Sequence, residues 1–223
     1  MDNSTSIRTY HEYLNEAAYC LRHSLPSQTK SSELTPLALD NLLLQQDVLS
    51  RYAFILSVLA LESATNALLL STNLLNTLER KPTLDKIRSF CSHRGVEYDE
   101  NSIETIRIKE LLSCRNAIVH PKQTKSLYEI DDQDFILFDS VRFSPLRNYP
   151  DYFCLLKHSH AVSSVQDVLK FTAHICFDCC RMEFAEGALC LGAGSYGSTA
   201  DFEVVESHLG ITFDKRSLGL SPS

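Results

Sequence analysis

The chain has 223 residues, of which 44% are hydrophobic and 22% are charged, a composition typical of a soluble globular protein with one domain, or with one domain and an extension. Its formal net charge is −7. This excludes a protein that follows a nucleic-acid backbone over many phosphates, because such proteins carry a basic stripe. If the chain binds RNA, it must use a local cleft or a basic partner.

The termini and the apolar segments favour a cytoplasmic protein. The polar start at residues 1–4 has no basic segment followed by an apolar one, so no secretory signal is expected. The most apolar stretch, residues 52–70, is interrupted by Glu62, Thr65 and Asn66, which favours a buried core helix over a membrane span. The eight cysteines are then expected to be free thiols in a reducing compartment.

The first half of the chain predicts helices. Residues 7–22 repeat apolar positions every three to four residues, as an amphipathic helix does. Thr35-Pro36 has the pattern of a helix start, with an N-cap residue before proline. The apolar pattern then continues to about Leu78 without Gly or Pro, which predicts two helices or one long bent helix, with residues 48–75 as the central core helix.

The second half adds further helices and one different segment. A short helix is expected from Leu84 to Cys91, and another over 103–119, which Pro121 ends at or near His120. Residues 127–143 are rich in aromatic and branched side chains and predict a short hairpin or an extended arm. Residues 164–188 predict the last helix.

The predicted fold is therefore mainly α, a bundle of four to five helices with a small β-like insertion. The helical domain is expected over residues 1–190, with its core at about 36–188 and the insertion at about 126–158. Residues 191–223 are richer in Gly and Ser and form a C-terminal extension, either an added segment or a partly ordered terminus.

The strongest candidate for chemistry lies at the end of the helix predicted over 103–119. It consists of Arg115, Asn116 and His120, followed directly by Pro121. On an ideal helix Arg115 and His120 are about 140° apart, so they converge only if the helix ends or loosens at His120. Asn116 lies one turn before His120 and could hold the imidazole in one tautomer.

This segment resembles the signature of the HEPN superfamily, in which Arg, a polar residue and His stand at the end of a core helix. Glu62 and Asn66 resemble the acidic and polar positions on the preceding core helix of many members. The resemblance extends over about residues 36–188. It implies a small helical bundle, catalytic Arg115, Asn116 and His120, and supporting roles for Glu62 and Asn66. From its position alone, Glu62 could pair with Arg115 and orient it; the alternative is that Glu62 and Asn66 form a buried polar pair inside the bundle.

The resemblance implies a metal-independent endoribonuclease that needs no cofactor. The RNA 2′-hydroxyl would attack the adjacent phosphate, leaving a 2′,3′-cyclic phosphate and a 5′-hydroxyl. Histidine can transfer the proton near neutral pH, and arginine offers fixed charge and forked donors to the developing phosphorane. In the family two motifs usually face each other across a homodimer, which would concentrate positive charge in an acidic protein.

Three interpretations of the biological role remain open. The first is a ribonuclease toxin or abortive-infection effector, with an antitoxin on a separate chain, because the nucleotidyltransferase motif found in such antitoxins is missing from this sequence. The second is a non-catalytic HEPN module for assembly or regulation, with residues 135–143 and the extension as its partner surface. The third is an unrelated all-α protein with an accidental motif.

Three other patterns favour structural roles. The glycines of residues 192–197 match a dinucleotide-binding fingerprint, but a single βαβ unit cannot bury itself, so a flexible turn is preferred. His174, Cys176, Cys179 and Cys180 suggest zinc, but they lack two separated ligand pairs, which favours core packing. The acidic residues 131–134 are interpreted as a solvated turn.

Overall fold

The computed structural model describes residues 9–25, 35–120, 128–130, 136–138, 141–191 and 199–219, and within these ranges the protein is mainly helical. The helices are α1 (Tyr10–His23), α2 (Pro36–Ser71), α3 (Leu75–Leu78), α4 (Thr83–His93), α5 (Ile103–Val119), α6 (His158–Ala173), α7 (Phe184–Cys190) and α8 (Ala200–Leu209). Shorter turns of 3₁₀-helix lie at Phe153–Leu155 and Arg216–Leu218, and a π-helical segment extends from His174 to Cys179.

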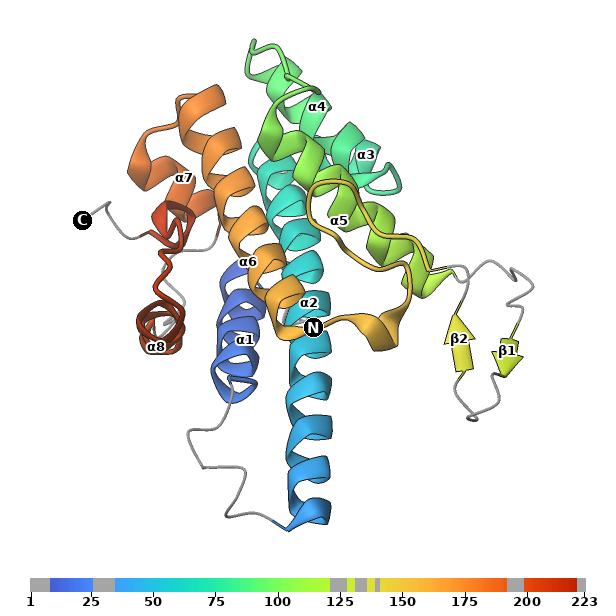
Figure 1. The fold of residues 1–223 in the computed structure, drawn as a ribbon. Helices are drawn as coiled ribbons and strands as arrows, with labels where there is room; N and C mark the ends of the chain where they lie inside the picture. Colours follow the sequence, from blue (N-terminus) through green and yellow to red (C-terminus); the bar gives the residue numbers. More distant parts are fainter. Residues whose placement is uncertain are drawn as a thin grey trace, which may run out of the picture.

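Helix α2 is the central element, and α1 and α6 lie along it (Figure 1). It starts where the sequence predicts, because the Thr35 side chain accepts the Ala38 N–H and Pro36 occupies the first turn. It ends at Ser71, where Asn73 adopts φ 60°, so the long apolar pattern produces one long helix and the short α3. The described residues contain only this helix with the length and composition of a membrane span; 56% of its most apolar window is buried, as in a core helix.

Helix α5 carries the motif and also has the predicted bounds. The Ser102 hydroxyl accepts the Thr105 N–H at its start, and His120 leaves the helical conformation at its end with φ −123° and ψ 65°. Pro121, which was expected to stop the helix, lies outside the described residues. Two short strands, β1 (Tyr128–Ile130) and β2 (Ile136–Phe138), pair antiparallel within the range of the expected insertion.

The single last helix predicted over 164–188 is a wrong prediction. Helix α6 starts earlier, at His158, and passes into the π-helical segment at His174. Arg181 then adopts φ 49°, which ends the helix before α7 begins. A left-handed residue interrupts the helical path, and the apolar periodicity does not reveal it because apolar positions continue on both sides.

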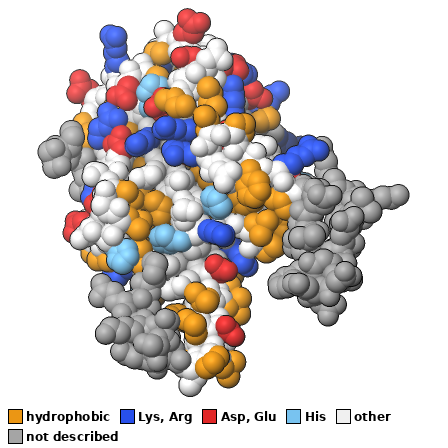
Figure 2. Space-filling model, in the orientation of Figure 1, with side chains coloured by type: hydrophobic (Ala, Val, Ile, Leu, Met, Phe, Trp, Pro, Cys, Tyr) orange, Lys and Arg blue, Asp and Glu red, His pale blue; other side chains and the backbone are white. Residues whose placement is uncertain are grey.

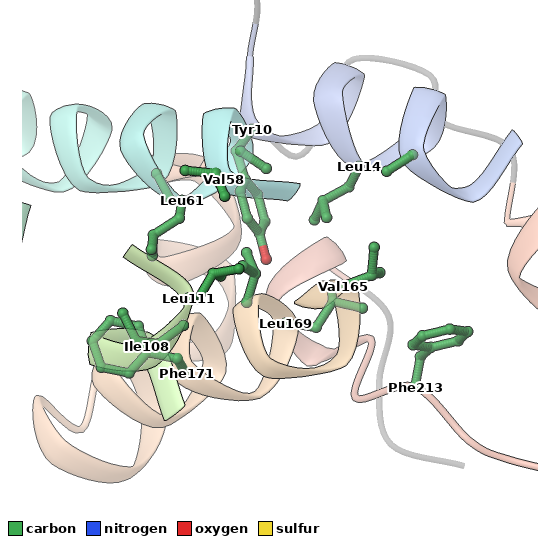
Figure 3. Packing of buried hydrophobic residues seen from close by; sticks show 14 of the residues in the cluster. Tyr10, Leu14, Val58, Leu61, Ile108, Leu111, Val165, Leu169, Phe171 and Phe213 are labelled. Atoms are coloured by element: carbon green, nitrogen blue, oxygen red, sulfur yellow. The ribbon is translucent and has the colours of Figure 1, made fainter. Parts of the chain in front are cut away.

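The core is one cluster of buried side chains that includes the C-terminal extension. Figure 3 shows Tyr10 and Leu14 of α1 facing Val165 and Leu169 of α6, with Phe213 nearby. Phe202, Val205 and Phe213 are buried in the same cluster, and the Tyr10 hydroxyl lies 2.8 Å from the Ser217 Oγ. Residues 199–219 therefore pack on the bundle and contribute to its stability.

Candidate functional site

A pocket of about 630 Å³ opens between the C-terminal half of α2, the start of α4 and the face of α5. Its volume is in the range of small-molecule sites. The described lining residues are Glu62, Asn66, Lys81, Pro82, Thr83, Leu84, Lys86, Lys109, Leu112, Ser113, Arg115 and Asn116. Four of the five predicted site residues are among them.

Helical spacing explains why these side chains meet. Glu62 and Asn66 are four residues apart on α2, so both point to one side of that helix. On α5, Lys109, Ser113 and Asn116 follow one another at intervals of four and three residues, which places them on one face. Each helix buries another face in the core, and the two polar faces enclose the pocket.

Arg115 lies at the centre of the contacts inside the pocket. One of its guanidinium nitrogens is 3.4 Å from Glu62 Oε1, and another donates to Asn116 Oδ1 at 3.1 Å. Its side chain keeps 29% of its surface exposed. The guanidinium is thus held by a carboxylate and an amide while part of its donor fork remains open to a ligand.

The other cations of the pocket have their own contacts. Lys86 donates to Asn66 Oδ1 at 2.8 Å. Lys109 donates to the Glu100 carbonyl oxygen at 2.9 Å and forms an ion pair with the Glu100 carboxylate, which does not line the pocket, at 3.6 Å. Glu62 and Asn66 therefore contact different partners on different helices. With Lys81 and Arg115, the lining residues supply four cations against one carboxylate, in a chain whose net charge is −7. This imbalance makes the pocket locally attractive to anions.

His120 has a different environment from the other predicted site residues. It caps α5, its backbone N–H donates to the Asn116 carbonyl at 2.9 Å, and its side chain is exposed. It does not belong to the described residues that line the pocket. The Asn116 amide oxygen accepts from Arg115, and the expected Asn116–His120 side-chain contact is not among the described hydrogen bonds. Within one chain, the histidine lies outside the basic pocket.

Segment 141–157 holds the other side of α5 in place. Glu110 of α5 accepts the backbone N–H groups of Leu146 and Arg147, both at 2.9 Å. Arg147 in turn forms an ion pair with the buried Asp167 of α6. Burial raises the pKa of Asp167 even though the guanidinium of Arg147 opposes this shift. These contacts fix α5 relative to α6 and thereby position the pocket-facing side chains.

The three lysines of the pocket were not predicted from the sequence. A signal for Lys109 exists, because it lies seven residues before Asn116 and therefore on the same helical face. No comparable signal exists for Lys81 and Lys86, since their position in the pocket depends on how α4 packs against α2.

The cysteine-rich segment, which suggested zinc, is built into the packed end of α6. Cys176 and Cys180 are buried and Cys179 is half-buried at the end of α6. Among the described residues, no group of three or more His, Cys, Asp or Glu side chains has a geometry that could hold a metal ion. The glycine-rich residues 192–197 and the acidic residues 131–134 lie outside the described ranges.

No protein-family model matches the chain, and no curated protein and no solved structure matches it either.

Proposed function

We propose that the chain is a metal-independent, HEPN-type endoribonuclease that acts in the cytoplasm as a toxin or abortive-infection effector. The observation that carries the proposal is the basic pocket at the motif. Arg115 and Asn116 lie in a cavity with three lysines, although the chain as a whole is acidic. An acidic protein that binds RNA needs such a local concentration of positive charge.

The chemistry of the pocket suits phosphate recognition. The lysines supply point charges for phosphate oxygens, and Arg115 supplies planar paired donors for the charge that develops during attack by the 2′-hydroxyl. Glu62 holds the guanidinium from one side, so its orientation is set before substrate binds. His120 supplies the group that transfers a proton near neutral pH.

A homodimer accounts for the position of His120 outside the pocket of its own chain. Helix α2 carries exposed apolar side chains along its N-terminal half, which we call the α2 stripe: Leu37, Leu44, Val48 and Tyr52. At 100° per residue these four positions fall within about 80° of one another. Figure 2 shows hydrophobic side chains exposed along this projecting part of the molecule.

The α2 stripe and the pocket face the same direction. Leu44 and Glu62 are 18 residues apart, as are Val48 and Asn66, and 18 residues make about five full turns of helix. A second copy that covers the stripe would therefore lie on the side of the pocket. The exposed His120 of each chain can then complete a composite site with the Arg115 pockets.

A non-catalytic assembly module is the second candidate function, and the α2 stripe is the observation that favours it. Exposed apolar side chains on a part of a helix that packs against little of the described chain are typical of a protein-binding surface. In this case the stripe binds a partner protein, and the ion pair between Arg115 and Glu62 has a structural role only. An antitoxin of the ribonuclease would use the same stripe or the pocket.

RNA cleavage in excess EDTA separates the two functions. The wild type is expected to cut RNA to 2′,3′-cyclic phosphate and 5′-hydroxyl ends, and Arg115→Ala and His120→Ala are each expected to lose at least about 100-fold in rate. Lys170→Ala and His93→Ala are matched controls, because both residues are exposed and neither is a described lining residue of the pocket.

The variants are first compared in thermal unfolding and in molecular mass, so that loss of fold is recognised. If wild type and all four variants cut equally, the proposed site is wrong. If the folded wild type is inactive on structured and single-stranded RNAs alike, the assembly function is favoured.

A further inference from the structure

A second group of reactive side chains lies at the opposite end of α4 from the pocket. Cys91 is in the last turn of α4, and Cys180 follows the π-helical segment that continues α6. The two sulfur atoms are 3.9 Å apart, although the residues are separated by 89 positions in the sequence. Two thiols from distant parts of the chain therefore meet inside the fold.

Neighbouring contacts hold the two elements in this arrangement. Arg94, which caps α4, forms an ion pair with Glu186 of α7 at 2.9 Å. The Cys180 N–H donates to the Ile175 carbonyl, and the Met182 N–H donates to the Cys176 carbonyl. The backbone on both sides of the thiol pair is thus fixed by contacts that do not involve the sulfur atoms.

We propose that Cys91 and Cys180 form an oxidisable dithiol site that hydrogen peroxide converts into a disulfide bond between α4 and the end of the π-helical segment. The sulfurs need to approach by roughly 2 Å to reach the ~2.05 Å of a disulfide bond. Reversible disulfides of this kind act as redox sensors in reducing compartments, where permanent disulfides are rare.

The environments of the two thiols assign their roles in the reaction. Cys91 is fully buried, whereas Cys180 retains 7% of its surface, so peroxide reaches Cys180 first. The neighbouring Cys91 thiol and the positive charge of Arg94 lower the pKa of Cys180, which favours its thiolate. The hydrogen bond with Cys180 and burial raise the pKa of Cys91, which keeps it a thiol until Cys180 has reacted.

The reaction balances with one molecule of peroxide. The Cys180 thiolate attacks a peroxide oxygen, the O–O bond breaks, and the released hydroxide takes up a proton to give water. The sulfur of Cys91 then loses its proton and attacks the Cys180 sulfenic acid. The S–S bond forms, the S–O bond breaks, and the second oxygen leaves as water. Two thiols lose two hydrogens, and peroxide is reduced to two waters.

Cys179 offers the strongest competing reaction. Its sulfur is 3.1 Å from His174 Nε2, and it adjoins Cys180 in the sequence. Burial raises the pKa of Cys179 to about 11, which disfavours its thiolate. The π-helical turn also directs it toward His174, whereas Cys180 lies beside Cys91. Cys91 is therefore the expected partner of Cys180.

Peptide mapping of the oxidised full-length protein tests the proposal. Cleavage after Lys and Arg releases Cys91 alone in peptide 89–94 and three cysteines in peptide 171–181. After brief treatment with peroxide and blocking of remaining thiols, we expect one peptide pair, 89–94 joined to 171–181, with fragment ions that place the link at Cys180. Reduction should separate the pair, and oxidation should raise the thermal midpoint by about 5 °C or more.

Variants and an internal standard make the result decisive. Cys91→Ser and Cys180→Ser should each abolish the link, and Cys179→Ser and Cys176→Ser should retain it. The exposed Cys154 reports whether the peroxide dose oxidises an accessible thiol. The proposal is overturned if Cys180 links to Cys176, Cys179 or Cys190, if only intermolecular links form, or if Cys154 is oxidised while Cys91 and Cys180 remain thiols. The wild-type map gives the answer even where a serine variant fails to fold.

Discussion

The charged groups around Arg115 indicate which role its guanidinium has. Glu62 and Asn116 take up part of its donor fork, but 29% of the side chain remains exposed in a pocket that three lysines also line. A purely structural arginine in an ion pair needs no additional cations around it, because like charges raise the free energy of the empty pocket. The excess of positive charge is explained more simply by an anionic ligand than by the stability of the fold.

His11 carries a prediction about pH at the residue scale. It is buried, its Nε2 has no hydrogen-bond partner among the described residues, and burial lowers its pKa to about 4. The unfolded chain, with a pKa near 6.5, binds the proton more readily, so folding stability falls as pH decreases from about 6.5 toward 4. Between pH 7 and 4.5 we expect His11 to remove about 2 kcal/mol of stability.

Urea unfolding at both pH values measures this contribution. His11→Phe keeps a ring beside Tyr10 but cannot take up a proton, so the variant should lose about 2 kcal/mol less than wild type on acidification. His93→Phe, at an exposed position of α4, is the control and should behave as wild type. Parallel pH profiles for wild type and His11→Phe would contradict the assignment.

Helix α5 carries the prediction at the element scale. Its first turn depends on Ser102, whose Oγ accepts the Thr105 N–H at 3.2 Å. Ser102→Ala leaves this N–H without its cap and should lower the free energy of unfolding by about 1 kcal/mol, or the thermal midpoint by roughly 2–4 °C. Ser102→Asp, which restores an acceptor at the N-cap, should retain most of the stability; a midpoint for Ser102→Ala equal to that of wild type would show that the cap contributes nothing.

The boundary of a helix can be predicted from the sequence only where neighbouring residues determine it. The start of α2 follows from Thr35-Pro36, because capping is a local interaction, and Ser102 caps α5 in the same way. The break before α7 depends on a left-handed Arg181, a residue type that gives no warning of such a backbone. The role of residues 199–219 in the core was also open, since burial of Phe213 depends on tertiary packing.

Some residues of the candidate site can likewise be predicted from helical spacing, and others can be assigned only from the packing of the helices. The i, i+4 spacing of Glu62 and Asn66 places both on one face of α2, and the pocket includes them. The helical wheel also separates Arg115 from His120, and the pocket contains the arginine without the histidine. Lys81 and Lys86 could not be assigned to the site from sequence, because they reach it only through the packing of α4 on α2.

At the scale of the whole molecule, the N-terminal half of α2 is the unexplained feature of a monomer. Buried positions of this helix begin at Ser50, so the first four turns pack against little of the described chain. Exposed apolar surface on such a helix raises the free energy of the free monomer in water. The proposed association of two copies through the α2 stripe would remove this surface from water and would place both pockets on the side of the interface.

Leu44→Glu tests this assembly. Leu44 is 60% exposed in the single chain, so the substitution should change the thermal stability of a monomer by no more than about 0.5 kcal/mol. It places a charge within the proposed interface, where burying an unpaired carboxylate is strongly unfavourable.

We expect wild type to have the mass of a dimer at about 50 μM in light scattering, and Leu44→Glu to be a folded monomer with at least tenfold less RNA cleavage. Leu43→Glu makes the same substitution one position earlier, at a leucine that is 51% exposed. Leu43 lies about 100° from Leu44, on the side away from Val48 and Tyr52, so this variant should remain dimeric and active. A dimeric Leu44→Glu variant would place the interface elsewhere on the molecule, whereas a monomeric wild type that still cuts RNA would show that one chain holds the complete site.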